Sequence, residues 1–413
     1  MSDTLTIRAA RLRREGGTHD IRIENGTIVA VHPARSDVTD GSTIDAAGAL
    51  VTESFCNTHL HLDKVFTLAS LGDHALDFYQ GEGMGKAMSA IDAAAEVKRT
   101  QNAEQMVEYV RRALAMAAFY GTTHIRAFAD VDSKAGTRGV EVLCAARDEF
   151  AGIVDVQVVA FPQDGIIKET GAFELLQRSL EIGADVVGGI PWIEFTERAM
   201  ADHIRIAFDL AQAHDKDVSM LLDDAGDPGL RTLEMMAVAA AERGWTGRAL
   251  AHHCRAMALY PEPYFERLVA LLRDGRVSVV SDPHTGPLHA RVRELLDAGI
   301  NVALGQDDIS DAYYAFGRNN LLEVAFLGAH LLWAMTVPGQ EMVYDMVTTN
   351  AGKAMNVAGH EIAVGNPANL VILDAPSVTE ALRFQAAPRV VVSHGSVVDR
   401  DRMAEVGRIP TGS

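Results

Sequence analysis

The chain has 413 residues, of which 48% are hydrophobic, and its 37 Lys and Arg against 56 Asp and Glu give a formal net charge of -19. This composition is typical of a folded protein with a large core and excludes disorder as the main state. The negative balance argues against nucleic acid or an anionic membrane as a partner, because phosphate binding needs clustered Lys and Arg. It favours a small neutral or cationic substrate.

The cysteines and the first residues bear on the compartment. Cys56, Cys144 and Cys254 are too few and too scattered for a disulfide framework or a thiolate zinc cluster, which predicts a reducing, cytoplasmic location. Residues 1–10 lack the basic start and apolar stretch of an export signal. No uninterrupted apolar run reaches the ~18 residues of a membrane-spanning helix, so neither export nor a membrane span is expected.

Both ends of the chain carry strand patterns. Residues 5–31 read as short alternating strands, and the Asn25-Gly26 pair between apolar runs is typical of a hairpin turn. Residues 369–374 and 389–398 are rich in β-branched side chains and are separated by a polar loop. We therefore predict that both termini form one small β-sandwich.

Between the termini, buried-type strands alternate with amphipathic helices. The expected strands are 122–128, 154–161, 186–189, 218–222, 248–252, 277–281 and 301–304. The expected helices are 105–120, 173–182, 198–214, 230–243, 264–274 and 288–298.

Repeated strand and helix over roughly 300 residues predict an α/β fold, with a (β/α)8 TIM-type barrel as the commonest solution. A doubly wound open sheet is the alternative, but no Gly-rich phosphate motif follows the first strand. We place the barrel at residues 55–357 and the β-sandwich module at residues 1–54 and 358–413.

Polar residues gather where the expected strands end, which is where a parallel barrel has its active site. His59 and His61 are two residues apart on a strand, so both imidazoles can face one cation. The later strands contribute His124, Arg126, Gln163, Glu194, Asp223, Asp224, His252, His253, Gln306, Asp307 and Asp308. Two histidines and an acid from distant strands suit a divalent metal, which would supply a hydroxide nucleophile near neutral pH.

Several longer motifs point to a known family. They are NTHLHLDKVFT at 57–67, GTTHIRAFADVD at 121–132, VVAFPQDGI at 158–166, GADVVGGIP at 183–191 and ALGQDDISDAYYAFG at 303–317. With these motifs in order over most of its length, the chain resembles the amidohydrolase superfamily. Within it, the chain is similar to the branch that contains cytosine deaminases and N-isopropylammelide isopropylaminohydrolases.

The resemblance implies roles for the residues that match the family motifs. His59 and His61 would bind one divalent metal ion, zinc or iron, and Asp307 would bind it while accepting a proton from the attacking water. His253 would polarise the substrate or stabilise the hydroxide, and Asp224 falls where the family has its proton-shuttling glutamate.

The resemblance also implies a substrate pocket. Gln163 would read the carbonyl and N–H edge of a ring, and Asp308 would contact the substrate beside Asp307. Lys64 either neutralises a substrate carbonyl or lies on the surface. Trp192 either stacks on a flat heterocycle or packs in the core.

The chain departs from the family at the fifth barrel strand. The metal-binding histidine that stands three residues before the shuttle acid in relatives is Leu221 here, and leucine cannot bind a metal. Asp223, on the same strand face as Leu221, could supply an oxygen ligand. Alternatively His253 or His252 binds the metal, or the metal site is lost and the barrel is a ligand-binding protein. We favour a substituted site because the acids at the strand ends are kept.

These patterns together predict a metal-dependent hydrolase that acts on a C–N bond of a small nitrogen heterocycle, by cytosine-like or triazine-like deamination or aminohydrolysis. A cyclic amidohydrolase that opens a ring and a catalytically silent ligand-binding barrel are the alternatives. The expected partner is a small heterocyclic substrate, without nucleic acid or membrane, and a homo-oligomer is compatible with the sequence.

Overall fold

The computed structural model describes residues 4–34, 42–71 and 102–410. In this part of the chain, an eight-stranded sheet pairs each strand in parallel with the next along the chain. Its strands are β6 (Phe55–Leu60), β7 (Thr122–Asp130), β8 (Asp155–Phe161), β9 (Val186–Gly189), β10 (Asp217–Leu222), β11 (Ala249–His253), β12 (Ser278–Ser281) and β13 (Val302–Leu304). A parallel bridge between Leu60 and Asp307 closes the ring. The predicted α/β barrel is confirmed.

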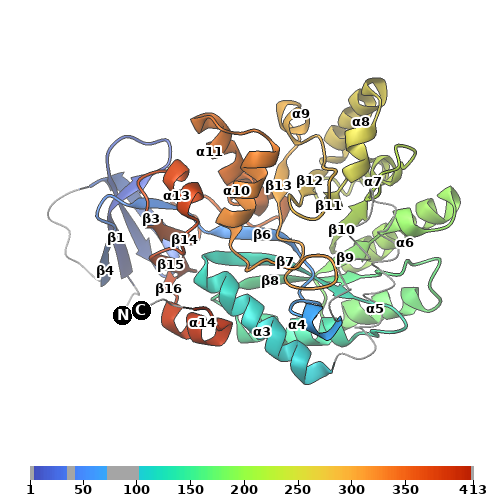
Figure 1. Cartoon of the computed structure of the whole chain (residues 1–413), viewed down its shortest axis with the longest axis horizontal. Coiled ribbons are helices and arrows are strands. Elements are labelled where there is room, and N and C mark those ends of the chain that lie inside the picture. Colours follow the sequence, from blue (N-terminus) through green and yellow to red (C-terminus); the bar gives the residue numbers. More distant parts are fainter. Residues whose placement is uncertain (1–3, 35–41, 72–101, 411–413) are drawn as a thin grey trace.

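Helices follow the strands and cover the outside of the barrel (Figure 1). They are α3 (Ala103–Phe119), α4 (Arg138–Glu149), α5 (Ala172–Ile182), α6 (Glu197–His214), α7 (Thr232–Glu242), α8 (Glu262–Gly275), α9 (Val292–Asp297), α10 (Leu321–Leu331), α11 (Val337–Asp345) and α12 (Thr349–Ala354). The short helix α1 (Leu68–Leu71) and the 3₁₀ helices η3 (Pro191–Ile193) and η4 (Arg255–Leu259) lie in the loops after β6, β9 and β11. In α8, the buried Phe265, Leu268 and Leu272 recur every three or four residues and face the barrel. Helices α1, α4, α10, α11 and α12 were not among the expected helices.

A second sheet joins the two ends of the chain. It contains β1 (Thr4–Leu12), β2 (His19–Glu24), β3 (Thr27–Pro33), β4 (Ser42–Asp45), β5 (Leu50–Glu53), β14 (Leu370–Leu373), β15 (Val390–Ser393) and β16 (Ser396–Val397). Strand β5 pairs antiparallel with β14, which brings the N- and C-terminal segments side by side. The Asn25-Gly26 pair joins β2 to β3 with both φ angles positive, as a type I′ hairpin turn requires.

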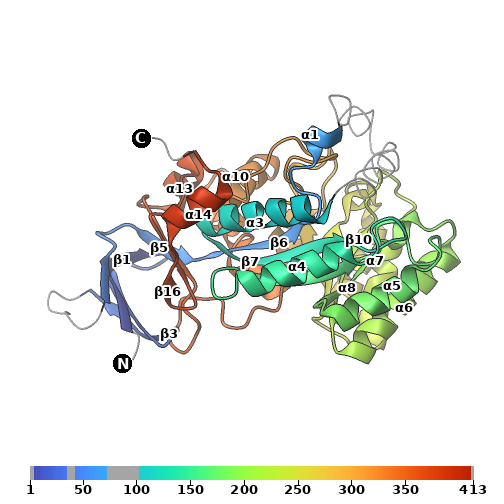
Figure 2. The same cartoon turned by 90° about the horizontal axis from the view of Figure 1, so that it is seen from below.

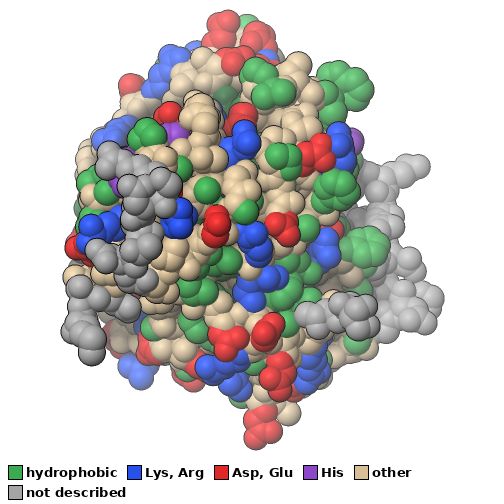
Figure 3. Space-filling model, turned by 90° about the vertical axis from the view of Figure 1, so that its left-hand side faces the viewer, with side chains coloured by type: hydrophobic (Ala, Val, Ile, Leu, Met, Phe, Trp, Pro, Cys, Tyr) green, Lys and Arg blue, Asp and Glu red, His purple; other side chains and the backbone are tan. Residues whose placement is uncertain are grey.

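The terminal sheet lies at one end of the barrel (Figure 2). Two further helices, α13 (Val378–Phe384) and α14 (Arg400–Gly407), lie beside it, and α14 packs against α3. On the face of the molecule that carries this sheet, acidic and basic side chains are interspersed (Figure 3). None of the helices in the described ranges is long and apolar enough to cross a membrane.

Two residues that the sequence placed at a strand end lie at the opposite end of the barrel. Strand β7 extends two residues beyond the expected end, and His124 and Arg126 are its third and fifth residues of nine. His124 Nε2 lies 3.4 Å from Asp155, the first residue of β8, and Arg126 Nη2 lies 3.6 Å from Asp217, the first residue of β10. Neither residue reaches the carboxyl ends of the strands, where Asp130 of β7 stands instead.

Candidate active site at the carboxyl ends of the strands

His59, His61 and Asp307 meet where the first and last barrel strands come together. Asp307 donates its backbone N–H to the carbonyl of His59 and accepts from the backbone N–H of His61, both at 2.8 Å. The Asp307 Oδ1 atom lies 3.5 Å from His59 Nε2 and 3.7 Å from His61 Nε2. All three side chains are buried, so the closure of the barrel itself assembles these groups.

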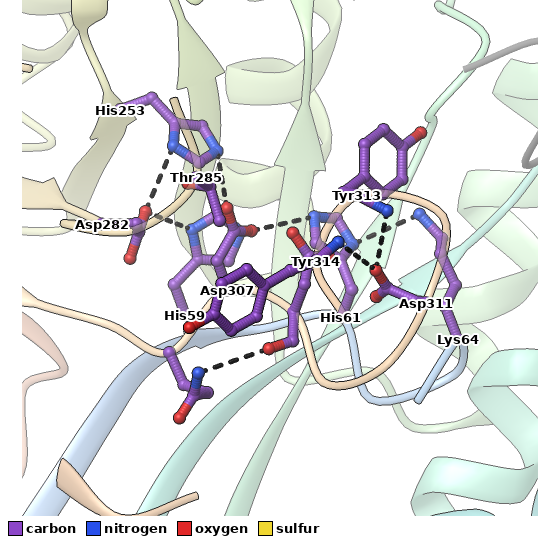
Figure 4. A network of polar contacts seen from close by, with 12 residues as sticks. His59, His61, Lys64, His253, Asp282, Thr285, Asp307, Asp311, Tyr313 and Tyr314 are labelled. Carbon is purple, nitrogen blue, oxygen red and sulfur yellow. Dashed lines mark hydrogen bonds and ion pairs between the residues drawn. The ribbon is translucent and has the colours of Figure 1, made fainter. Parts of the chain in front are cut away.

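His253 and Asp282 complete this cluster (Figure 4). His253 ends β11, and its Nε2 atom lies 3.9 Å from Asp307 Oδ2. Asp282 follows β12, and its Oδ2 accepts a hydrogen bond from His59 Nδ1 at 3.1 Å. His253 Nδ1 lies 3.2 Å from the same oxygen. Sequence reasoning missed Asp282, although an acid directly after a buried strand is the signal that identified Asp307.

The donor atoms of this cluster fit a divalent metal ion. Single ligand atoms from His59, His253, Asp282 and Asp307 all lie within 4.8 Å of one another. His59 Nε2 is buried and has no hydrogen-bond partner within the described ranges, as expected of an atom that needs a cation. Imidazole nitrogens with one or two carboxylates are typical ligands of zinc and of other borderline divalent ions.

Asp223 does not reach this cluster, which corrects its predicted role as a metal ligand. Strand β10 ends at Leu222, and Asp223 has a φ of +46°, so the strand alternation that would align it with Leu221 is broken. Its carboxylate instead accepts hydrogen bonds from Thr232, from the backbone N–H of Leu233 and from the hydroxyl of Tyr260. Asp223 therefore anchors the start of α7.

Asp224 points into the site and pairs with an arginine. Its Oδ1 lies 2.7 Å from Arg255 Nη1, and Arg255 Nη2 donates to Thr285 Oγ1 at 2.6 Å. Burial raises the pKa of Asp224 to about 7, against the opposing charge of Arg255. The carboxyl group can therefore hold a proton near neutral pH, which suits a general acid. Arg255 was not foreseen from the sequence.

Lys64 and Gln163 form a buried pair beside His61. Lys64 Nζ lies 2.9 Å from Asp130 Oδ1 and donates to Gln163 Oε1 at 3.0 Å. Because an ammonium group can only donate, the amide oxygen of Gln163 must face Lys64. The Nε2 donor of Gln163 is then the amide atom left for the pocket.

One pocket brings most of the predicted residues together. It is lined by His61, Gln163, Ile190, Trp192, Leu221, Asp224, His253, Arg255, Asp307, Asp308 and Tyr313. Burial and the neighbouring Asp307 and Asp311 carboxylates raise the pKa of Asp308 well above its usual range. Leu221 also lines the pocket, at the position where the resemblance implies a metal-binding histidine in relatives.

Two other strand-end candidates have structural contacts. His252 Nε2 contacts Ser219 Oγ at 2.7 Å and is not among the pocket-lining residues, so His253 is the member of the pair that faces the cluster. Glu194 accepts hydrogen bonds from the backbone N–H groups of residues 166–168 and contacts His203 Nδ1 at 2.8 Å. It therefore fixes the loop after β8.

Comparison with known proteins decides the family. The profile of the amidohydrolase family matches residues 77–399. The chain belongs to the amidohydrolase family. The predicted resemblance is confirmed, as is the assignment to hydrolases that act on C–N bonds with a metal.

Several relatives match this amidohydrolase over nearly its whole length. N-isopropylammelide isopropyl amidohydrolase of Pseudomonas sp. strain ADP is 28% identical over 97% of this chain and 98% of its own. Pterin deaminase of Rhizobium rhizogenes is 26% identical over 92% of this chain and 88% of its own. The structure of 5-methylcytosine deaminase from Klebsiella pneumoniae has a TM-score of 0.87 and 31% identity, covering 95% of this chain and 97% of that chain.

The buried Asp224 predicts how the stability of the metal-free amidohydrolase depends on pH. The unfolded chain ionises Asp224 near its ordinary pKa of 3.8, whereas the folded chain keeps the proton until about pH 7. The folded state binds more protons between these values, so the contribution of Asp224 to stability falls as pH rises through this window. Between pH 5 and 8 the free energy of unfolding of Asp224→Asn should rise relative to that of the parent protein by about 3 kcal/mol.

Urea unfolding of both chelator-treated proteins at the two pH values measures this difference, and titrating groups that do not interact with Asp224 cancel in it. A difference that does not change with pH would contradict the raised pKa of Asp224.

Proposed function

We propose that this amidohydrolase hydrolyses the bond between a ring carbon of a small nitrogen heterocycle and an exocyclic amino or alkylamino nitrogen. The convergence of His61, His253 and Asp307 beside Asp224 in one pocket, with the buried His59 against Asp307, carries the proposal. The relatives are named for 5-methylcytosine, N-isopropylammelide and pterin, and these names support a flat nitrogen ring as the substrate class.

We infer that His59, His61 and Asp307 hold one divalent ion, zinc or iron. Such an ion, when bound, supplies an acidified water for attack on the ring carbon near neutral pH. With the ion bound, Asp307 would accept one proton of the attacking water, and Asp224 would deliver a proton to the departing nitrogen. As the C–N bond breaks, the new C–O bond would become a ring carbonyl and ammonia or an amine would leave. The two protons of the water end on the departing nitrogen and on a ring nitrogen of the carbonyl product.

The remaining side chains bind and orient the ring. Gln163 donates its Nε2 hydrogens to a ring acceptor, since Lys64 occupies its oxygen. Trp192 offers an apolar face, and Asp308, whose pKa burial raises well above its usual range, lies in the same pocket to contact a ring nitrogen. Burial and Arg255 lower the pKa of His253 well below its usual range, so this imidazole is neutral at the site.

Metal analysis of protein purified without chelator tests the centre of this proposal. We expect about one zinc or iron per chain and a loss of most of it in His61→Ala. The exposed His330, on α10, provides the matched control, and His330→Ala should keep its metal. Metal that is substoichiometric and indifferent to His61→Ala would contradict the metal centre and favour a ligand-binding barrel.

A substrate panel tests the reaction. The parent protein and His61→Ala are incubated with 5-methylcytosine, N-isopropylammelide, pterin and a cyclic amide, and free ammonia, amine and carboxylic acid are measured. Ammonia or amine release that requires His61 supports the proposal. Production of a linear acid from the cyclic amide alone would favour the ring-opening alternative. The homo-oligomer and the cytoplasmic location stay predictions.

A further inference from the structure

Asp282 is a fully buried carboxylate that, among the described residues, forms ion pairs with two histidines of the site. Its Oδ2 accepts from His59 Nδ1 at 3.1 Å and lies 3.2 Å from His253 Nδ1, although the second contact does not meet hydrogen-bond geometry (Figure 4). No lysine or arginine of the described residues forms an ion pair with Asp282. The backbone leaves room for this carboxylate, because a Cβ on Gly305 would lie 2.6 Å from Asp282 Oδ1.

The position of Asp282 decides which imidazole nitrogens remain for a metal. An imidazole that donates Nδ1–H to a carboxylate carries its lone pair on Nε2. His59 Nε2 and His253 Nε2 lie 3.5 and 3.9 Å from the two oxygens of Asp307. The hydrogen bond to Asp282 therefore turns the lone pair of His59 toward Asp307, and the 3.2 Å contact places His253 Nδ1 beside the same Asp282 oxygen, with His253 Nε2 on the side of Asp307.

Charge balance favours the same arrangement. Asp282 and Asp307 are both buried, and an uncompensated carboxylate in the interior is costly. A divalent cation beside three neutral imidazoles would balance the two carboxylates. With Leu221 in place of the β5 histidine, His253 is a further imidazole that this cluster offers, and its Nε2 atom lies 3.9 Å from Asp307 Oδ2.

We propose that Asp282 holds His59 and His253 in their Nδ1-protonated forms and thereby makes His253 a metal ligand in place of the histidine that Leu221 replaces. This inference rests on the proposed metal centre. It makes Asp282 a positioning residue, since it acts through His59 and His253 and stays on the far side of both imidazole rings from Asp307.

The test compares the metal affinity of the parent protein, Asp282→Asn, His253→Ala and the double variant, by competition between zinc and a chromophoric chelator. Asp282→Asn should bind zinc about 10 to 100-fold more weakly. If Asp282 acts through His253, part of this loss should disappear in the His253→Ala background. Asp223→Asn removes a neighbouring buried acid outside the cluster and should leave zinc affinity unchanged.

The visible absorption spectrum of the cobalt(II)-substituted protein is a second measurement, and a loss of stability alone would not change it. Both Asp282→Asn and His253→Ala should shift its absorption bands, and Asp223→Asn should not. Nitrogen-15 NMR of the metal-free parent protein tests the proposal without replacing Asp282. It should show Nδ1–H tautomers for His59 and His253, and the signal that disappears in His253→Ala belongs to His253.

The outcomes separate the two proposals. If the parent protein binds zinc and releases ammonia or an amine while Asp282→Asn keeps its affinity and its cobalt spectrum, the role of Asp282 is overturned and the proposed function stands. Nε2–H tautomers for both histidines would overturn it as well. A parent protein that binds no zinc or cobalt would overturn the metal centre and this inference together.

Discussion

Replacing Asp224 by asparagine is expected to leave the metal content unchanged and to lower kcat by about 10² to 10⁴-fold, the usual range for loss of a general acid. The carboxyl group lines the pocket and lies 3.9 Å from His253 Nε2, and burial raises its pKa to about 7. It can therefore deliver a proton near neutral pH, whereas an amide of the same shape cannot. Steady-state kinetics on the substrate found in the panel, with metal analysis of the same samples, measure both quantities.

Two further variants make this result specific. Asp224→Glu keeps an ionisable carboxyl group and should retain more of kcat than Asp224→Asn, even though the longer side chain crowds Arg255. Asp223→Asn removes the adjacent acid, whose oxygens bind Thr232 and Tyr260, and should reduce stability rather than kcat. A fall in kcat that is equal for the two asparagine variants would contradict the assignment of the proton donor to Asp224.

The sequence was sufficient for the barrel and for most of the pocket. Strands buried on both faces produce continuous apolar runs, as in β7, where all nine residues are buried, and these runs alternate with helical periodicity. The carboxyl ends of parallel strands meet at one end of a barrel. His61, Gln163, Asp224 and Asp307 could therefore be assigned to one pocket from their positions after apolar runs.

The details that sequence reasoning missed depend on backbone turns and on distant partners. Strand alternation placed Asp223 on the metal face, but the chain leaves β10 at Leu222 and a positive φ turns the side chain toward α7. Asp282 precedes a proline in a sequence that is typical of a turn. The neighbouring residues do not indicate that its carboxylate binds His59, which is 223 residues away in the sequence. Arg255 lies in a 3₁₀ helix after β11, where the pattern gives no signal.

Replacing Arg126, which the sequence analysis had assigned to the wrong end of the barrel, has the largest expected effect on stability. Arg126→Ala should lower the free energy of unfolding by about 3 to 5 kcal/mol, because it breaks a buried ionic network inside the barrel. The guanidinium donates to Gln157 Oε1 at 2.9 Å and to the carbonyl of Met355 at 3.3 Å, and it lies 3.6 Å from Asp217. Its side chain is only 1% exposed, so water cannot replace these contacts.

Arg248 offers a matched control because it pairs with the same acid from the surface. Arg248 Nε lies 2.8 Å from Asp217 Oδ1, but its side chain is 32% exposed. Arg248→Ala should therefore cost no more than about 1 kcal/mol. Urea unfolding of the parent protein and both variants measures the difference. An equal decrease in the free energy of unfolding for the two variants would mean that the ion pair with Asp217, which both arginines form, determines the decrease. A larger decrease for Arg126→Ala would assign the difference to the burial of Arg126 inside the barrel.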